Sequence, residues 1–191
     1  MTFLLEIGDN ISSIIEKVSN GDLKSFKILY TQFYDRLFKF SIHYTKSERA
    51  SEEVVSDVFL NLWHKRTVLY EIESLETYLF KSVKNKSLSY IRDNSDFTNH
   101  VPLDSVFFVE DNYPAEDPEQ IMMNDELRKL FQLEVDHLPD RCKIIFKLVK
   151  EDGMRYKQIS EILGISIRTI DSQMAIAMKR IGEALKKYSG K

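Results

Sequence analysis

The sequence lacks several features that mark particular classes of protein. It has a single cysteine, Cys142, so it cannot form an internal disulfide. It contains neither a glycine-rich phosphate loop nor a paired-carboxylate pattern. Its four histidines have no spacing typical of a metal site or a catalytic triad: His43, His64, His100 and His137. These absences argue against an enzyme, so we expect no catalytic residue, no metal, no cofactor and no small-molecule substrate.

Long apolar runs are also missing. No stretch approaches the ~20 apolar residues that a membrane-spanning helix needs. The first residues, MTFLLEIGDNISS, have no basic start and too short an apolar segment for a secretory signal. The composition, 43% hydrophobic and 30% charged, is that of an ordinary folded protein. We therefore expect a cytoplasmic protein.

The net charge of −3 hides a strong segregation of charge along the chain. Residues 1–92 hold 13 Lys and Arg against 12 Asp and Glu. Residues 93–130 hold 2 against 10, and residues 131–191 hold 12 against 8. Two neutral or basic segments therefore flank an acidic one.

The acidic segment has the composition of a linker. Three of the four prolines fall in it: Pro102, Pro114 and Pro118. It shows no sustained helical periodicity, and a linker of this length inside one compact domain would be unusual. We expect two domains, residues 1–95 and 128–191, joined by an acidic linker over residues 96–127.

Apolar residues in the first domain recur every three or four positions, which predicts helices with one buried face. The pattern follows a short helix over residues 11–18 and forms a first stripe: Phe26, Leu29, Tyr30, Phe33, Tyr34, Leu37 and Phe38. A second stripe comprises Val54, Val55, Val58, Phe59, Leu62 and Trp63. Asp22 is positioned to cap the first of these helices, and Ser47 or Ser51 the second. A third helix is predicted to start near Ser74.

This third helix combines charges and rings that suit nucleic acid. It carries four basic residues and no acid between residues 81 and 92: Lys81, Lys84, Lys86 and Arg92. The aromatic residues Tyr78, Phe80 and Tyr90 lie among them. Cations neutralise phosphates and rings stack on unpaired bases, so the helix suits melted DNA. A solvated basic face with core aromatics remains the alternative.

The second domain carries a helix-turn-helix pattern in YKQISEILGISIRTIDSQMAIAMKRI. Apolar residues surround a turn at Gly164: Ile159, Ile162, Leu163, Ile165 and Ile170. Glycine adopts the left-handed conformation of such a turn at little cost, and Ser166 can then cap the second helix. This arrangement exposes Arg168, Thr169, Ser172 and Gln173 to a major groove. A helical hairpin that binds no DNA would show similar spacing.

Both halves of the chain resemble one family. SEEVVSDVFLNLWHKR, SLETYLFKSVKNKSLSYIRD, LPDRCKIIF and YKQISEILGISIRTIDSQ are similar, in this order, to the extracytoplasmic-function sigma factors of bacterial RNA polymerase, in the sigma-70 family. The form TIDSQMAIAMKRI is similar to members from the Bacteroidetes. The resemblance implies an all-α fold of two small helical domains, the second with the helix-turn-helix. It also implies a factor that binds polymerase core, directs it to promoters and melts DNA locally.

The resemblance also implies roles for individual residues. The core-binding motif would contain Asp57, Leu60, Asn61 and Trp63, although Trp63 itself fits the protein core better. The minus-ten element would be opened and held by Lys84, Asn85, Lys86, Ser87 and Tyr90. The minus-thirty-five element would be read by Arg168, Thr169, Asp171, Ser172, Gln173 and Ile176.

The partners implied are RNA polymerase core, promoter DNA and an anti-sigma factor, which in Bacteroidetes-like members is often a membrane protein. The principal alternative is an autonomous regulator that binds DNA through the helix-turn-helix alone. The second basic, aromatic surface around residues 81–92 counts against it.

Overall fold

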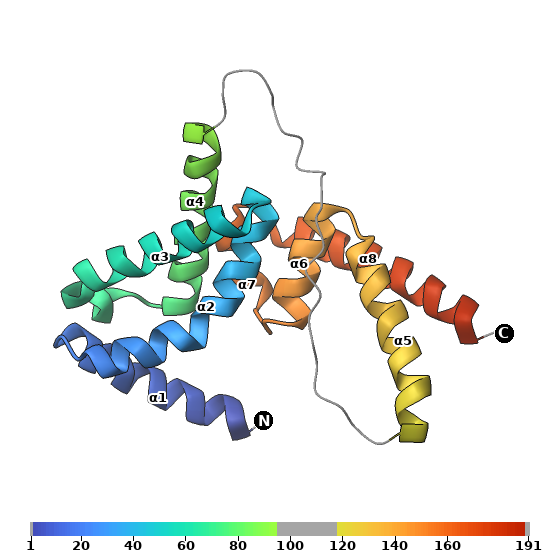
Figure 1. The fold of residues 1–191 in the computed structure, drawn as a ribbon, viewed down its shortest axis with the longest axis horizontal. Coiled ribbons are helices and arrows are strands. Elements are labelled where there is room, and N and C mark those ends of the chain that lie inside the picture. Colours follow the sequence, from blue (N-terminus) through green and yellow to red (C-terminus); the bar gives the residue numbers. More distant parts are fainter. Residues whose placement is uncertain (1, 95–117, 190–191) are drawn as a thin grey trace. The chain divides into compact units, whose positions relative to one another are not determined.

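Helices alone build the part of the chain that the computed structural model describes, residues 2–94 and 118–189 (Figure 1). The chain divides into two compact units. The first contains α1 to α4, and the second contains α5, α6, α8 and most of α7. The prediction of an all-α fold is confirmed.

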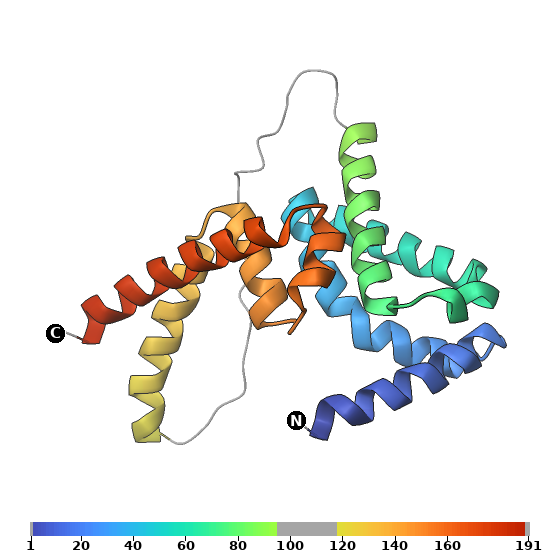
Figure 2. The same cartoon turned by 180° about the vertical axis from the view of Figure 1, so that it is seen from behind.

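The first unit is a bundle of four α-helices and one short 3₁₀ helix. Its elements are α1 (Thr2–Ser19), α2 (Leu23–Thr45), α3 (Glu48–His64), η1 (Arg66–Glu71) and α4 (Leu75–Asn94). Helix α2 packs against both α3 and α4, and α3 packs against α4, while α1 lies along α2 and η1 (Figure 2). Helix α1 is longer than the predicted segment 11–18.

Polar caps fix where α2 and α3 begin. The Asp22 carboxylate accepts hydrogen bonds from the backbone N–H groups of Lys24 (3.2 Å) and Ser25 (3.1 Å) and from the Ser25 hydroxyl (2.6 Å). The Ser25 hydroxyl and backbone bonds lower the pKa of Asp22, because they stabilise the charged carboxylate. The Ser47 hydroxyl accepts from the Ala50 N–H (3.3 Å), so Ser47 is the cap of α3 and Ser51 is not.

The core of the first unit follows the predicted stripes. Large side chains from α2, α3 and α4 are almost completely buried: Leu29, Phe33, Leu37, Val54, Val55, Phe59, Leu62, Leu79, Phe80 and Val83. Each such side chain stabilises the fold by about 1.5–3 kcal/mol relative to an exposed one. At the edge of this core Arg36 lies over the Phe80 ring (5.4 Å) and pairs with Glu76 (2.6 Å), which ties α2 to the start of α4.

The second unit consists of α5 (Pro118–Asp136), α6 (Asp140–Lys150), α7 (Tyr156–Leu163) and α8 (Ile167–Ser189). Helix α8 packs against α5 and α6. Apolar side chains from all four helices are buried in this unit: Val135, Leu138, Cys142, Ile145, Phe146, Leu148, Ile159, Ile170, Met174, Ala177 and Ile181. The buried Lys143 ammonium donates to the Asp136 carbonyl and lies 3.9 Å from the Asp136 carboxylate, which pins α6 to the end of α5.

Part of the segment predicted to be a linker is helical. Helix α5 begins at Pro118, so residues 118–127 belong to a helix and not to an irregular tether. Proline is well tolerated in the first turn of a helix, because the N–H that it lacks would have no partner within the helix. The rest of the predicted linker, residues 96–117, lies outside the described residues.

Candidate functional site

Helix α3 presents one exposed face away from the bundle. Its apolar residues turn toward α2 and α4, which leaves Leu60 and Asn61 exposed, and Asp57 lies one turn before them, half-buried at the edge of this face next to α4. Leu60 is 57% exposed. Three of the four residues predicted to bind core polymerase are therefore brought together, and an exposed leucine lies among polar groups.

Trp63, the fourth residue of that set, lies differently. Its ring is half-buried, with the Phe26 ring 4.9 Å away and the Arg66 guanidinium 4.7 Å above it. Arg66 also donates to the Trp63 carbonyl (3.0 Å). Trp63 thus packs the end of α3 against α2.

Helix α4 distributes the residues predicted to bind minus-ten DNA over four sides, one of which is buried. Asn85 lies on its most exposed ridge, whose members are Lys81, Asn85, Leu88 and Arg92. Lys86 and Tyr90 lie on the flank next to α3, and Lys84 lies on the other flank. Lys81 and Arg92 belong to the predicted basic, aromatic pattern but not to the residues that the family resemblance assigns to the minus-ten element. Lys81 lies four residues before Asn85 and Arg92 four residues after Leu88, so all four residues share one face.

Ser87 lies on the buried side of α4. It is 0% exposed, and its hydroxyl is 3.0 Å from the equally buried hydroxyl of Ser41 on α2. A direct contact between this hydroxyl and DNA is not possible in the described structure, because the side chain faces the core. Ser87 instead holds α4 against α2.

An ion pair joins two residues predicted to serve different partners. The Lys86 ammonium on α4 lies 2.7 Å from the Asp57 carboxylate on α3. Their side chains are 41% and 38% exposed. The exposed face of α3 and the flank of α4 are therefore in electrostatic contact.

The helix-turn-helix is present where the sequence predicts it. Helix α7 ends at Gly164, which has a left-handed φ of 71° and donates to the Ser160 carbonyl. The Ser166 hydroxyl accepts from the Thr169 N–H (3.0 Å) and so caps α8. Ile159 and Ile162 on α7 and Ile170 on α8 are buried, as the helix-turn-helix pattern predicts.

The first turns of α8 present the predicted recognition residues. Arg168, Asp171, Ser172 and Ile176 are exposed, and Thr169 and Gln173 are half-buried. The Thr169 hydroxyl is 2.8 Å from that of Ser166 and thus belongs to the cap.

Helix α8, which carries these recognition residues, is hydrogen-bonded to α6. The Cys142 thiol on α6 donates to the Gln173 carbonyl (3.2 Å), which holds the backbone of α8 on α6. Helix α6 therefore supports the part of α8 that carries the exposed recognition side chains, and precise recognition of base edges needs such support.

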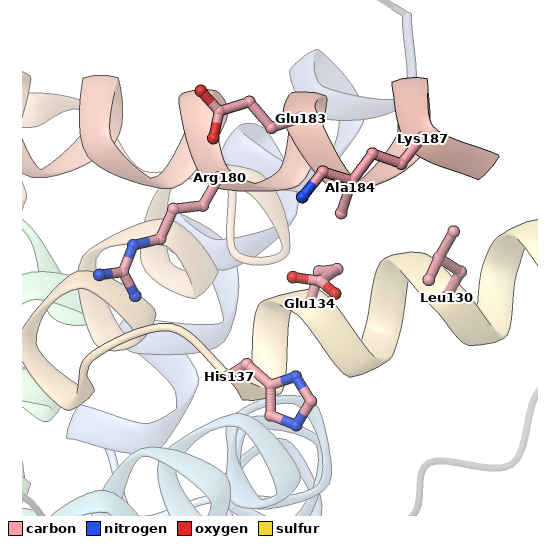
Figure 3. Close-up of a pocket in the computed structure, with 7 residues that line it drawn as sticks. All are labelled: Leu130, Glu134, His137, Arg180, Glu183, Ala184 and Lys187. Carbon is pink, nitrogen blue, oxygen red and sulfur yellow. The ribbon is translucent and has the colours of Figure 1, made fainter. Parts of the chain in front are cut away.

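A groove of about 810 Å³ lies between α5 and α8 in the second unit (Figure 3). Acidic, basic and apolar side chains line it: Leu130, Glu134, His137, Arg180, Glu183, Ala184 and Lys187. The mixed charge does not favour one kind of ligand. No cluster of His, Cys, Asp or Glu able to hold a metal ion occurs within residues 2–94 and 118–189. None of the helices in those two ranges is long and apolar enough to cross a membrane.

Comparison with known proteins identifies both units. Residues 29–97 match the family model "Sigma-70 region 2", and residues 128–181 match "Sigma-70, region 4". The RNA polymerase sigma-H factor of Pseudomonas aeruginosa is 19% identical over 90% of this chain and 92% of its own. The ECF RNA polymerase sigma-E factor of Escherichia coli K12 is 22% identical over 88% of this chain and 90% of its own.

Two solved structures share the fold. The sigma factor RpoE of Bartonella quintana, solved with the anti-sigma factor NepR, matches with a TM-score of 0.58 and 23% identity over 86% of this chain and 98% of that one. CnrH, solved with the cytosolic domain of CnrY, matches with a TM-score of 0.54 and 16% identity over 91% and 96%.

Proposed function

We propose a division of labour for this chain, which belongs to the extracytoplasmic-function sigma factors of the sigma-70 family. Members of this family bind RNA polymerase core and direct it to promoters. In the proposal, the first unit binds core and opens the minus-ten element, and the second unit reads the minus-thirty-five element. Two separate candidate DNA surfaces in one chain, on α4 and α8, support this assignment over an autonomous regulator with one.

The core-binding surface in this proposal is the exposed face of α3. Asp57, Leu60 and Asn61 provide a charge, an apolar anchor and an amide within about one helical turn. Leu60 is one of several exposed large apolar side chains in the described residues, and what supports its role is its place in the segment that resembles the core-binding motif of the family. Trp63 supports this face from inside by packing on Phe26.

The minus-ten surface is formed by α4. Asn85 lies at its centre, Lys81 and Arg92 extend the same ridge, and Lys84, Lys86 and Tyr90 flank it. The cations bind phosphates, and the tyrosine ring offers a surface for an unpaired base. Ser87 acts indirectly, by fixing α4 on α2.

The minus-thirty-five surface is the amino-terminal half of α8. Arg168, Ser172 and Gln173 can donate hydrogen bonds to base edges, and Asp171 can accept one from cytosine. Ile176 and Thr169 complete the surface, with Thr169 also serving the cap.

An anti-sigma factor completes the proposed set of partners. Two relatives of known structure were solved as complexes, one with an anti-sigma factor and one with the cytosolic domain of another protein. We propose that an inhibitor covers the α3, α4 or α8 surfaces of this chain when the factor is inactive. The protein acts in the cytoplasm with polymerase, where bond formation belongs to the polymerase and not to this chain.

Polymerase binding tests the first half of the proposal. Leu60→Asp should abolish most core binding in co-purification and lower run-off transcription with it, because it places a charge in the apolar anchor. Ile28→Asp is the matched control, since Ile28 on α2 is 54% exposed and outside the proposed surface. If Leu60→Asp bound core as well as the unaltered protein does, the proposal that α3 contacts core would be wrong.

DNA recognition tests the second half. Arg168→Ala should leave core binding intact and reduce transcription from promoters with a minus-thirty-five element about 10-fold, as expected for the loss of one base contact. Lys187→Ala, near the other end of α8, serves as the control.

The minus-ten surface has a test of its own. Joint charge reversal at Lys84 and Lys86 should weaken open-complex formation more than core binding. Equal loss of both activities would contradict the proposed division.

A further inference from the structure

The ion pair between Asp57 and Lys86 connects the two proposed surfaces of the first unit. Lys86 Nζ lies 2.7 Å from a carboxylate oxygen of Asp57. The two residues are 29 positions apart in the sequence and belong to different helices, so only the packing of α3 on α4 brings them together. We infer that this pair is a charge latch: it withholds Lys86 from DNA in the free factor, and polymerase core releases it by taking Asp57.

The latch follows from competition for charge. A carboxylate bound by a protein partner is recognised by a cation or an N–H donor, which weakens its attraction for Lys86. Conversely, an ammonium that neutralises a DNA phosphate no longer stabilises Asp57. Each partner therefore favours the other, and thermodynamic linkage requires the effect to be equal in both directions.

The exposure of the pair limits the size of the effect. Both side chains are about two-fifths exposed, so solvent screens their attraction. An exposed pair of this kind corresponds to a coupling of about two- to fivefold in affinity. That range suits a latch, because a buried pair would be too costly to open.

The inference rests on the proposed function only for the identity of the two partners, and the first experiment needs no polymerase. The affinity of the free, full-length protein for a mixed-sequence single-stranded DNA oligonucleotide is measured as a function of salt. Asp57→Asn should raise this affinity about two- to fivefold. The slope of the logarithm of affinity against the logarithm of salt concentration should become steeper by about 0.7, as one additional phosphate contact would make it. Circular dichroism should show an unchanged fold.

Two controls separate the latch from a general loss of negative charge. Glu53→Gln removes one acid from α3 one turn before Asp57, and it should raise the affinity by clearly less than Asp57→Asn. In a Lys86→Gln background, Asp57→Asn should have no effect beyond that of Glu53→Gln. An equal gain in the presence and absence of Lys86 would overturn the inference.

Core polymerase provides the second arm. In the wild-type protein, core should increase the contribution of Lys86 to DNA binding, whereas with Asp57→Asn that contribution should be full before core is added. If Asp57→Asn left core affinity unchanged, the proposed core-binding role of Asp57 would fail. The polymerase-free result would still decide whether Asp57 restrains Lys86.

Discussion

At the scale of single residues, burial separates the side chains that support a surface from those that form it. Ser87 and Asn85 are two positions apart on α4, yet one is fully buried and the other exposed. The Ser87 hydroxyl is paired with that of Ser41, so each satisfies the other inside an apolar core. A buried hydroxyl that loses its partner destabilises a protein more than the joint loss of both.

This pairing predicts a non-additive mutant cycle. Ser87→Ala should lower the free energy of unfolding of the first unit by about 1–3 kcal/mol, because it leaves the Ser41 hydroxyl buried without its partner. The double variant Ser41→Ala/Ser87→Ala should lose clearly less than the sum of the single changes, as measured by urea unfolding. Ser89→Ala, at a half-buried position of the same helix, should change stability by less than about 0.5 kcal/mol. Strictly additive losses would argue that the two hydroxyls are independent.

At the scale of elements, local sequence signals predict the helices better than the contacts between them. Asp22 and Ser166 are recognisable caps because their hydrogen bonds stay within three residues, and both act as caps in the structure. The sequence leaves Ser47 and Ser51 open as caps of α3, and the structure shows that the cap is Ser47. The start of α5 was not predictable in this way, since acidic residues and proline concealed its periodicity.

The candidate site shows the same limit. Asp57, Leu60 and Asn61, which the family resemblance groups together, lie within about one turn of each other on α3. Helical spacing also places Ser87 on the buried side of α4, because it lies four residues after the buried Val83, whereas the family resemblance assigns Ser87 to DNA. The contact between Asp57 and Lys86 could not be inferred, because it depends on how α3 packs against α4.

Replacement by alanine should have opposite effects on stability at two glycines of the second unit, Gly164 in the turn between α7 and α8 and Gly182 inside α8. Gly164 has a φ of 71°, so Gly164→Ala should destabilise the second unit by about 1–2 kcal/mol and weaken minus-thirty-five recognition. Gly182 is inside α8, and a Cβ there would meet nothing within 4 Å. Gly182→Ala should therefore stabilise by about 0.5–1 kcal/mol. Thermal melting of both variants checks the two signs, and a stabilising Gly164→Ala would mean that the left-handed turn is not required.

At the scale of the whole molecule, the two units have separate proposed tasks. The first is built mainly from α1 to α4 and the second mainly from α5 to α8, so most contacts of a unit arise within one stretch of chain. The proposed domain boundary at residue 128 cuts α5. This matters because α5 packs against α8, the helix that carries the recognition residues.

Two fragments of different length test this boundary. A fragment of residues 118–191 should fold, and it should melt about 4–8 °C above a fragment of residues 128–191, which corresponds to about 1 kcal/mol. The longer fragment keeps the whole of α5, whereas the shorter one starts inside the helix. Both fragments should bind minus-thirty-five DNA weakly without polymerase. Equal melting temperatures would place the functional boundary at residue 128 after all.

The hydrogen bond from the Cys142 thiol to the Gln173 carbonyl makes this thiol a probe of motion in the second unit. Cys142 is the only cysteine of the sequence, it is buried, and burial raises the pKa of its thiol. Separation of α6 and α8 would expose the thiol and favour the reactive thiolate. The rate at which an alkylating reagent modifies Cys142 in the unaltered protein therefore reports how often α8 separates from α6. A bound promoter should slow that rate although the DNA does not contact the sulfur.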